Sequence, residues 1–179
     1  ASGIGNSAFG SRNIASGFSN TSAFGYLNRA IGNESGAFGN FNTASGSWDS
    51  AFGIYNTASG SSSSAFGFRN TASGIRSSVF GYQSVARGTG STAIGYESVA
   101  NESYVVSFGH RAGDLNVFGT AFSTDQFTRL INVANGTHDN DAVNLGQLNA
   151  AISSVAVGSP YFAANGGGGG ADSIATGKD

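Results

Sequence analysis

The residue types that most often carry out chemistry are sparse in this chain of 179 residues. Its two histidines, His110 and His138, lie far apart in the sequence, and each stands beside a predicted turn or helix cap. A general base or a metal ligand needs partners that converge with it, and the chain has no cysteine to complete a thiolate site. We therefore interpret both histidines as solvated surface residues.

Asp139 and Asp141 form a close pair of carboxylates, the arrangement used for acid–base catalysis. Capping of a helix, or contacts with Arg129, explains them better, because short acidic side chains are favoured where a helix begins. Serine is abundant, but no Gly-x-Ser-x-Gly elbow stands on a strand-to-helix turn with a partner acid and histidine. The glycine run 166–170 lacks the repeated Gly-Gly-x-Gly-x-Asp of calcium-binding repeats. We predict no catalytic residue, no cofactor and no metal.

Composition excludes further classes of protein. Lys, Arg, Asp and Glu make up 10% of the chain, and 8 basic residues with a net charge of −2 give no basic stripe for nucleic acid. Aromatic residues reach 12%, which is too much for a disordered linker. The chain begins without Met, a basic region or an apolar signal segment, and it has no apolar run long enough to span a membrane. We therefore expect a soluble fragment of a longer protein.

A tripeptide of a small residue, Phe (once Ile) and Gly recurs every 14 residues after a first step of 15. Its central residues are Phe9, Phe24, Phe38, Phe52, Phe66, Phe80, Ile94 and Phe108. A second motif, Ala-x-Gly, follows at a fixed phase, with Asn (later Ser) between the two motifs. The unit is too short for a helix and a strand, so it predicts a parallel solenoid in which two short strands and two turns form each coil.

Coils of equal length place equivalent residues above one another, which predicts Phe, Ala and Asn ladders. Side chains alternate across a strand, so each Phe points away from its small neighbours, and a thin roll can close over Ala and Gly. The Phe ladder then fills the roll or lines an outer face. A lone chain buries little apolar surface against the entropy of ordering it, so we expect self-association along the rod.

The repeat fades after Ile94, and residues 110–130 read as an insertion, a hairpin that carries Phe118, Phe122 and Phe127. Beyond it, Asp139, Asn140 or Asp141 is the expected N-cap of a helix. The apolar residues of that helix step by three and four, as in a coiled-coil seam or a short helix packed on its own domain. These apolar residues are Leu145, Leu148, Ile152 and Val155. Pro160 ends the segment, and the glycine run follows as a flexible stretch.

These motifs resemble the head and neck of trimeric autotransporter adhesins of the YadA type. The repeat Ser-x-Ala-Phe-Gly-x-x-Asn-x-Ala-Ser-Gly is similar to the head repeat, and 132–136 with 141–148 resembles the neck motif. The resemblance divides the chain into head repeats (1–109), a head insertion (110–130), a neck (131–149), a short coiled coil (150–160) and the start of a following head (161–179). Neck residues on this reading are Arg129, Asn132, Val133, Gly136, Asp139, Asp141, Ala142, Val143, Gln147 and Leu148.

The resemblance implies a mainly β protein, a left-handed parallel β-roll in a homotrimer followed by a neck and a coiled-coil helix. It further implies a location on the outer membrane of a Gram-negative bacterium, through a C-terminal anchor outside this sequence, and attachment to host cells or extracellular matrix. The ligand-binding residues are unknown; Tyr26, Tyr55, Tyr82, Trp48 and Arg69 are residue types common at binding hot spots. A structural spacer without a ligand is the alternative. An ice-binding solenoid is a weaker one, because the threonine ladder Thr43, Thr57, Thr71 spans three coils only.

Overall fold

The structure is a computed structural model that describes residues 1–158. It divides the chain into two units, Ala1–Thr128 and Arg129–Asp179, and each is treated by itself below. The predictions for Pro160, the glycine run and the start of a following head lie outside the described residues.

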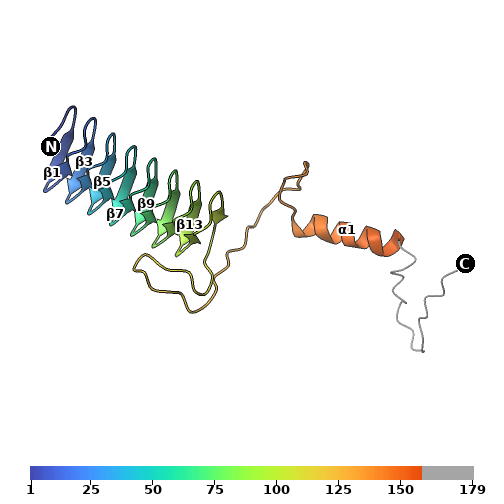
Figure 1. Ribbon diagram of the computed structural model, residues 1–179. Helices are drawn as coiled ribbons and strands as arrows, with labels where there is room; N and C mark the ends of the chain where they lie inside the picture. The colour runs from blue at the N-terminus through green and yellow to red at the C-terminus, as the bar shows by residue number, and fades with distance from the viewer. Residues whose placement is uncertain (159–179) are drawn as a thin grey trace, which may run out of the picture. The chain divides into compact units, whose positions relative to one another are not determined.

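The first unit is a roll of short parallel strands in two sheets (Figure 1). The longer strands form an eight-stranded sheet, here the long sheet, and the two-residue strands form a seven-stranded sheet, here the short sheet. The long sheet contains, in spatial order, β1 (Ser7–Ser11), β3 (Ser22–Tyr26), β5 (Gly36–Asn40), β7 (Ser50–Ile54), β9 (Ser64–Phe68), β11 (Ser78–Tyr82), β13 (Thr92–Tyr96) and β15 (Val106–Ser107). The short sheet contains β2 (Ile14–Ala15), β4 (Arg29–Ala30), β6 (Thr43–Ala44), β8 (Thr57–Ala58), β10 (Thr71–Ala72), β12 (Val85–Ala86) and β14 (Val99–Ala100).

Every strand pairs with its equivalent in the next coil, so like residues stand in register. Phe52 of β7 pairs with Phe66 of β9, and Ala58 of β8 pairs with Ala72 of β10. The step is 14 residues throughout except between the first two coils, where it is 15: Phe9 of β1 pairs with Phe24 of β3, and Ala15 of β2 pairs with Ala30 of β4. This arrangement confirms the predicted parallel solenoid of 14-residue coils; its hand stays a prediction.

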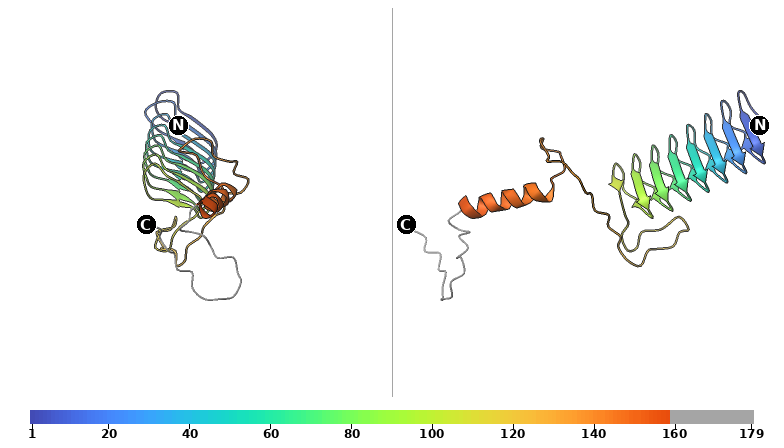
Figure 2. Two further views of the ribbon diagram at one scale, coloured as in Figure 1. Left: turned by 90° about the vertical axis from the view of Figure 1, so that its right-hand side faces the viewer. Right: turned by 180° about the vertical axis from the view of Figure 1, so that it is seen from behind.

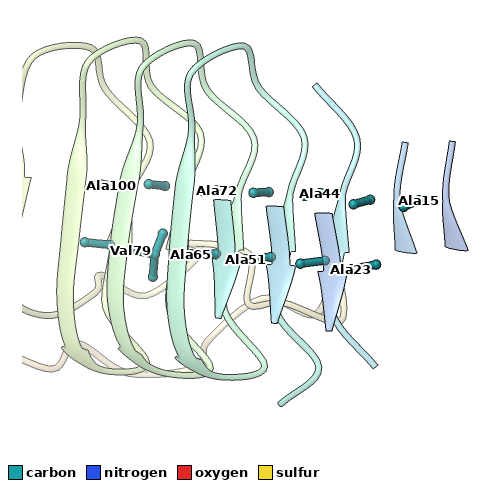
Figure 3. Close-up of a cluster of buried hydrophobic side chains, with 13 residues drawn as sticks. Ala15, Ala23, Ala44, Ala51, Ala65, Ala72, Val79 and Ala100 are labelled. Carbon is teal, nitrogen blue, oxygen red and sulfur yellow. The ribbon is translucent and has the colours of Figure 1, made fainter. Parts of the chain in front are cut away.

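The core of the roll is a double column of alanines. In one coil, Ala51 of the long sheet and Ala58 of the short sheet are both fully buried, and the same holds for their equivalents in the neighbouring coils (Figure 3). Phe52 and Thr57 alternate with these alanines and point outward. The interior is too thin for larger side chains in most coils, with Val79 the exception. The roll therefore closes over Ala, and the Phe ladder lies outside it.

The two corners of each coil are built alike. At each corner one residue has a positive φ, such as Tyr55 (59°) or Ser62 (61°), and the residue after it turns a polar side chain into the interior. Asn56 and Ser63 are these buried residues, and both are fully shielded from solvent. A buried polar group must find hydrogen-bond partners, so the two corners form two internal polar columns.

The asparagine column satisfies itself from coil to coil. Asn56 donates through its backbone N–H and its Nδ2 to Asn42 Oδ1, at 3.0 and 3.1 Å. Its Nδ2 also donates to the carbonyl oxygens of Phe52 and Gly67, both at 2.7 Å. The same pattern repeats at Asn28, Asn42 and Asn70. The predicted Asn ladder is confirmed, and its role is to bind the corners of successive coils together.

Residues 110–128, here called the strap, leave the last coil and turn back alongside the roll (Figure 2). Two antiparallel bridges, His110 with Gln126 and Leu115 with Ala121, hold the strap as an irregular hairpin. Arg87 fixes it to the short sheet by donating to the carbonyl oxygens of Leu115 (2.8 Å) and Asn116 (3.1 Å). The predicted insertion thus has the hairpin form expected of it.

The second unit contains one described helix, α1 (Leu145–Gly158), preceded by an irregular segment from Arg129. Within residues 1–158, no helix combines the length and the apolar character needed to cross a membrane.

Candidate assembly face and neck clasp

The outer face of the long sheet carries the phenylalanine column, the candidate assembly face. Ring centroids of successive members from Phe24 to Phe80 lie 5.2, 4.6, 5.1 and 5.1 Å apart, with planes within 6° of parallel. Phe9 at the first coil is tilted by 33° to Phe24, and Ile94 continues the column on β13. Phe108 follows β15, beyond the last paired residue of the column. In-register pairing at the strand spacing forces this stacking.

Stacking covers the faces of these rings and leaves their outward edges uncovered. The exposed fraction of Phe24 is 37% and that of Phe80 is 46%, whereas Phe38, Phe52 and Phe66 in the middle of the column are half-buried. The column is therefore a continuous apolar stripe on the surface of the single chain. Stripes of this kind usually mark an interaction surface.

A second aromatic column runs beside the first, at the end of each long strand and the corner after it. Tyr82 stacks on Phe68 at 5.0 Å and on Tyr96 at 5.5 Å, and Phe41 stacks on Tyr55 at 4.7 Å. The guanidinium of Arg69 lies 5.4 Å from the centroid of Tyr55 and 5.7 Å from that of Phe118 in the strap. Arg69 therefore joins this column to the strap by cation–π contacts.

The residues predicted as ligand anchors do not form one cluster. Tyr26, Tyr55 and Tyr82 belong to the second aromatic column, and Arg69 is engaged by aromatic rings. Trp48 stands at the opposite corner, where its indole N–H donates to Glu34 Oε2 at 3.1 Å, and it is largely exposed. Trp48 is the most exposed residue of the set.

The interpretation of His110 as a solvated residue was wrong. Its exposed fraction is 7%, its ring stacks on Phe122 at 3.5 Å, and its Nδ1 lies 2.9 Å from the carbonyl oxygen of Glu97. His110 thus fills the end of the last coil beneath the strap. His138, in contrast, is exposed and lies 3.5 Å from Asp141.

The acidic pair lies in the irregular segment before α1 and does not form a joint carboxylate site. Asp141 accepts hydrogen bonds from the backbone N–H groups of Thr137 (2.8 Å) and His138 (3.0 Å), and these bonds lower its pKa. Asp139 is exposed. Among residues 1–158, no three His, Cys, Asp or Glu side chains gather as metal ligands would.

The prediction that Asp139, Asn140 or Asp141 caps the helix was wrong, since Asn144 does so. Asn144 Oδ1 accepts from the N–H of Gln147 at 3.0 Å, and Gln147 Oε1 reaches back toward the N–H of Asn144 at 3.4 Å. This reciprocal pair is a capping box. Asp141 is unavailable as a cap because it closes the preceding turn.

The two capping residues also form hydrogen bonds to the segment predicted from the sequence as the neck. Gln147 accepts from the N–H of Gly136 at 2.8 Å and donates to its carbonyl oxygen at 2.9 Å. Asn144 Nδ2 donates to the carbonyl oxygen of Val133 (3.1 Å) and to Asn135 Oδ1 (2.7 Å). We call this set of bonds the neck clasp. Of the predicted neck residues, it includes Val133, Gly136 and Gln147, whereas Arg129, Asn132, Ala142 and Val143 are exposed outside it.

The apolar seam of α1 is uncovered in the single chain. Leu145, Leu148 and Ile152 are exposed by 71%, 50% and 58%. Their spacing is that of a coiled-coil seam, and the described residues of their own unit leave them exposed.

Sequence reasoning missed the second polar column, at the corner opposite the asparagines. Its fully buried members are Thr21, Ser35, Asp49, Ser63, Ser77 and Ser91. Their constant spacing of 14 residues was the available signal, but their types vary. Asp49 is the one carboxylate in this column, where it accepts from Gly46 N–H (2.6 Å), Ser63 N–H (2.8 Å) and Ser63 Oγ (3.0 Å).

Two family models match the chain, and both describe parts of trimeric autotransporter adhesins. The family model of the YadA head domain repeat matches residues 49–70, 72–98 and 86–112. The model of the coiled stalk of trimeric autotransporter adhesins matches residues 129–172. The crystal structure of the collagen-binding domain of the Yersinia adhesin YadA aligns with 27% identity and a TM-score of 0.37, over 83% of this chain and 88% of that one. No curated protein matches the chain significantly.

Proposed function

Because this chain belongs to the YadA-like trimeric autotransporter adhesins, we propose that its roll is the adhesive head of a homotrimer. The head attaches a Gram-negative bacterium to host cells or extracellular matrix. On this proposal residues 1–109 are the head and 110–130 its insertion. Residues 131–149 are the neck, and 150–160 begin the coiled coil that holds the head away from the outer membrane.

The observation that carries the proposed assembly is that both units leave an apolar surface uncovered. In the roll this surface is the phenylalanine column, and in α1 it is the seam of Leu145, Leu148 and Ile152. Covering the exposed half of each ring contributes about 1 kcal/mol per phenylalanine. The two surfaces belong to different units of one chain. Further copies of the same chain can cover both surfaces at once, because each copy carries the same two surfaces, and a homotrimer supplies two such copies.

Adhesion is supported by the stiffness and repetition of the outer surface. Corner residues such as Trp48 and Arg76 are held in place by the coil, and both are exposed. Side chains of these types dominate the energy of many protein interfaces. Three copies of each face on one trimer, and many trimers on one cell, multiply a weak contact into firm attachment.

The assembly is tested by removing the apolar face. In Phe52→Ser/Phe66→Ser, two outward rings are lost while the alanine core is kept. We expect this variant to sediment as a smaller species than the wild-type chain. The matched control is Thr57→Ser/Thr71→Ser, on the outer face of the short sheet, which should leave the mass unchanged. If Phe52→Ser/Phe66→Ser keeps a wild-type circular dichroism spectrum and the mass of the wild-type assembly, the proposed interface is contradicted.

Adhesion is tested separately by solid-phase binding of the full chain to collagen, fibronectin and laminin. We expect saturable binding to at least one of them, reduced in Trp48→Ala and retained in Tyr104→Ala. Tyr104 is the matched control because it is an aromatic residue on the last coil and is even more exposed than Trp48. Binding to none of the three by a correctly assembled protein contradicts direct adhesion to the matrix. The spacer role then becomes the function of this segment.

A further inference from the structure

The neck contains a dipeptide with a known chemical weakness, Asn135–Gly136. In an Asn–Gly sequence the glycine nitrogen can attack the asparagine side chain with little hindrance, because glycine has no Cβ. The tripeptide Ala134–Asn135–Gly136 has a second copy in the sequence, Ala164–Asn165–Gly166, which lies outside the described residues.

The reaction is an intramolecular deamidation that needs no reagent besides water. The nitrogen of Gly136 loses its proton to solvent and bonds to Cγ of Asn135, the Cγ–Nδ2 bond breaks, and ammonia leaves. Water then opens the resulting succinimide at one of its two carbonyl carbons. The product is aspartate or isoaspartate, so each event replaces a neutral amide with a negative charge.

The neck clasp engages the atoms that this reaction requires. The N–H of Gly136, whose nitrogen is the nucleophile, donates to Gln147 Oε1 at 2.8 Å, and the adjoining carbonyl oxygen accepts from Gln147 Nε2 at 2.9 Å. The amide oxygen of Asn135 accepts from Asn144 Nδ2 at 2.7 Å. The side chain of Asn135 is otherwise exposed, so solvent can reach it. With these bonds intact, the N–H of Gly136 is occupied as a donor and the side chain of Asn135 is fixed through its oxygen.

We propose that Asn135 is a deamidation site which the neck clasp keeps unreacted, and that opening of the clasp releases the reaction. The reaction proceeds only from the opened neck, so its rate measures how often the clasp opens. The isoaspartate product prevents closure, because it inserts an extra backbone carbon between residues 135 and 136. The backbone groups of Gly136 then no longer reach the side chain of Gln147 to form their hydrogen bonds. A neck that has stayed open is thereby marked permanently.

The test is a time course of the intact chain at mildly alkaline pH, followed by peptide mass spectrometry of the segments around Asn135 and Asn165. We expect Asn135 to react at least about tenfold more slowly in native buffer than in concentrated urea. Gln147→Ala should raise the native rate about tenfold, which corresponds to about 1.4 kcal/mol of lost clasp stability. Gln147→Glu, which keeps the acceptor and loses the donor, should lie between the two.

Two controls separate the clasp from general effects. Asn149→Ala, an exposed position of α1, should leave the rate at Asn135 unchanged. The rate at Asn165 in the same samples should not respond to Gln147→Ala. A native wild-type rate at Asn135 equal to the rate in urea overturns the proposal, and so does a Gln147→Ala rate equal to that of the wild type. Neither outcome depends on whether the chain is an adhesin.

Discussion

The glycines of the repeat allow the forces that hold the coils together to be separated by single substitutions. Two constraints can exclude a side chain from a glycine position, a positive φ and close contact with the next coil. They occur in different combinations at Gly53, Gly60 and Gly95. Gly53 has a φ of +114°, and a Cβ added to it would lie 2.1 Å from the carbonyl oxygen of Gly67 in the next coil. A Cβ added to Gly60 would lie 2.1 Å from the carbonyl oxygen of Gly74, and Gly60 has no positive φ. Gly95 has a φ of +111°, but a Cβ added to it would have no atom within 4 Å.

Alanine at each position therefore has a different cost. Gly95→Ala carries only the backbone strain of a positive φ, about 1–2 kcal/mol. Gly60→Ala carries only the clash, and Gly53→Ala carries both. To bring a carbon and an oxygen from 2.1 Å to an ordinary contact, the coils must separate by roughly 1 Å, which weakens several hydrogen bonds between them at about 1 kcal/mol each. We expect a loss of about 3 kcal/mol or more for Gly60→Ala and the largest loss for Gly53→Ala.

The assay is denaturant unfolding of the full chain, followed by circular dichroism at one fixed protomer concentration, because assembly makes apparent stability depend on concentration. Local opening in a solenoid can precede global unfolding, so the ranking of midpoints is the relevant result. If Gly95→Ala destabilises the chain as much as Gly53→Ala, contact between coils is not what excludes side chains, and the reasoning fails.

Three further predictions concern buried and bridging polar groups. Burial raises the pKa of Asp49, so the stabilising contribution of this carboxyl is present below the ordinary carboxyl pKa and is lost as the pH rises through the raised value. Asp49→Ser should therefore shift the midpoint of denaturant unfolding upward more at pH 7 than at about pH 3. A larger upward shift at about pH 3 would contradict this. Asn56→Ala removes the hydrogen-bond donor of buried carbonyl groups and should lower the free energy of unfolding by about 1–3 kcal/mol. Asn56→Ser should cost less, because a serine at the equivalent position of a later coil, Ser84, still donates to the carbonyl oxygen of Gly95 at 2.8 Å. Equal losses for the two variants would contradict the stabilising role of the asparagine column. Arg87→Ala should release the strap and speed amide exchange of Gly113 and Phe122 roughly tenfold, while an unchanged rate would show that Arg87 does not hold it.

The sequence predicted the roll because its repeat is strict where the fold is strict. Alanine recurs where the interior is thinnest, and glycine recurs where neighbouring backbones approach. Asn recurs where a corner must satisfy buried carbonyl groups. Because each of these positions permits few residue types, the structural repeat is visible as a repeat in the amino-acid sequence.

Other features depend on contacts that the repeat does not encode. Whether the phenylalanines lie inside or outside follows from the width of the roll, which is set by how closely Ala51 and Ala58 face one another. The second polar column escaped notice because a corner there accepts Thr, Ser or Asp. The burial of His110 depends on the strap, whose path follows from contacts at Arg69 and Arg87, far from it in the sequence.

The cap of α1 shows the same limit at short range. Asp141 has a suitable side chain, but its oxygen is taken by the amides of Thr137 and His138. The pattern Asn144-x-x-Gln147 was the signal that could have identified the cap.

The central claim is that the phenylalanine column and the seam of α1 are covered by two further copies of the chain. Sedimentation equilibrium of the purified chain over a wide range of concentration tests this most directly. We expect a single species of three times 17.9 kDa that persists on dilution. A well-ordered species of 17.9 kDa throughout that range would contradict it.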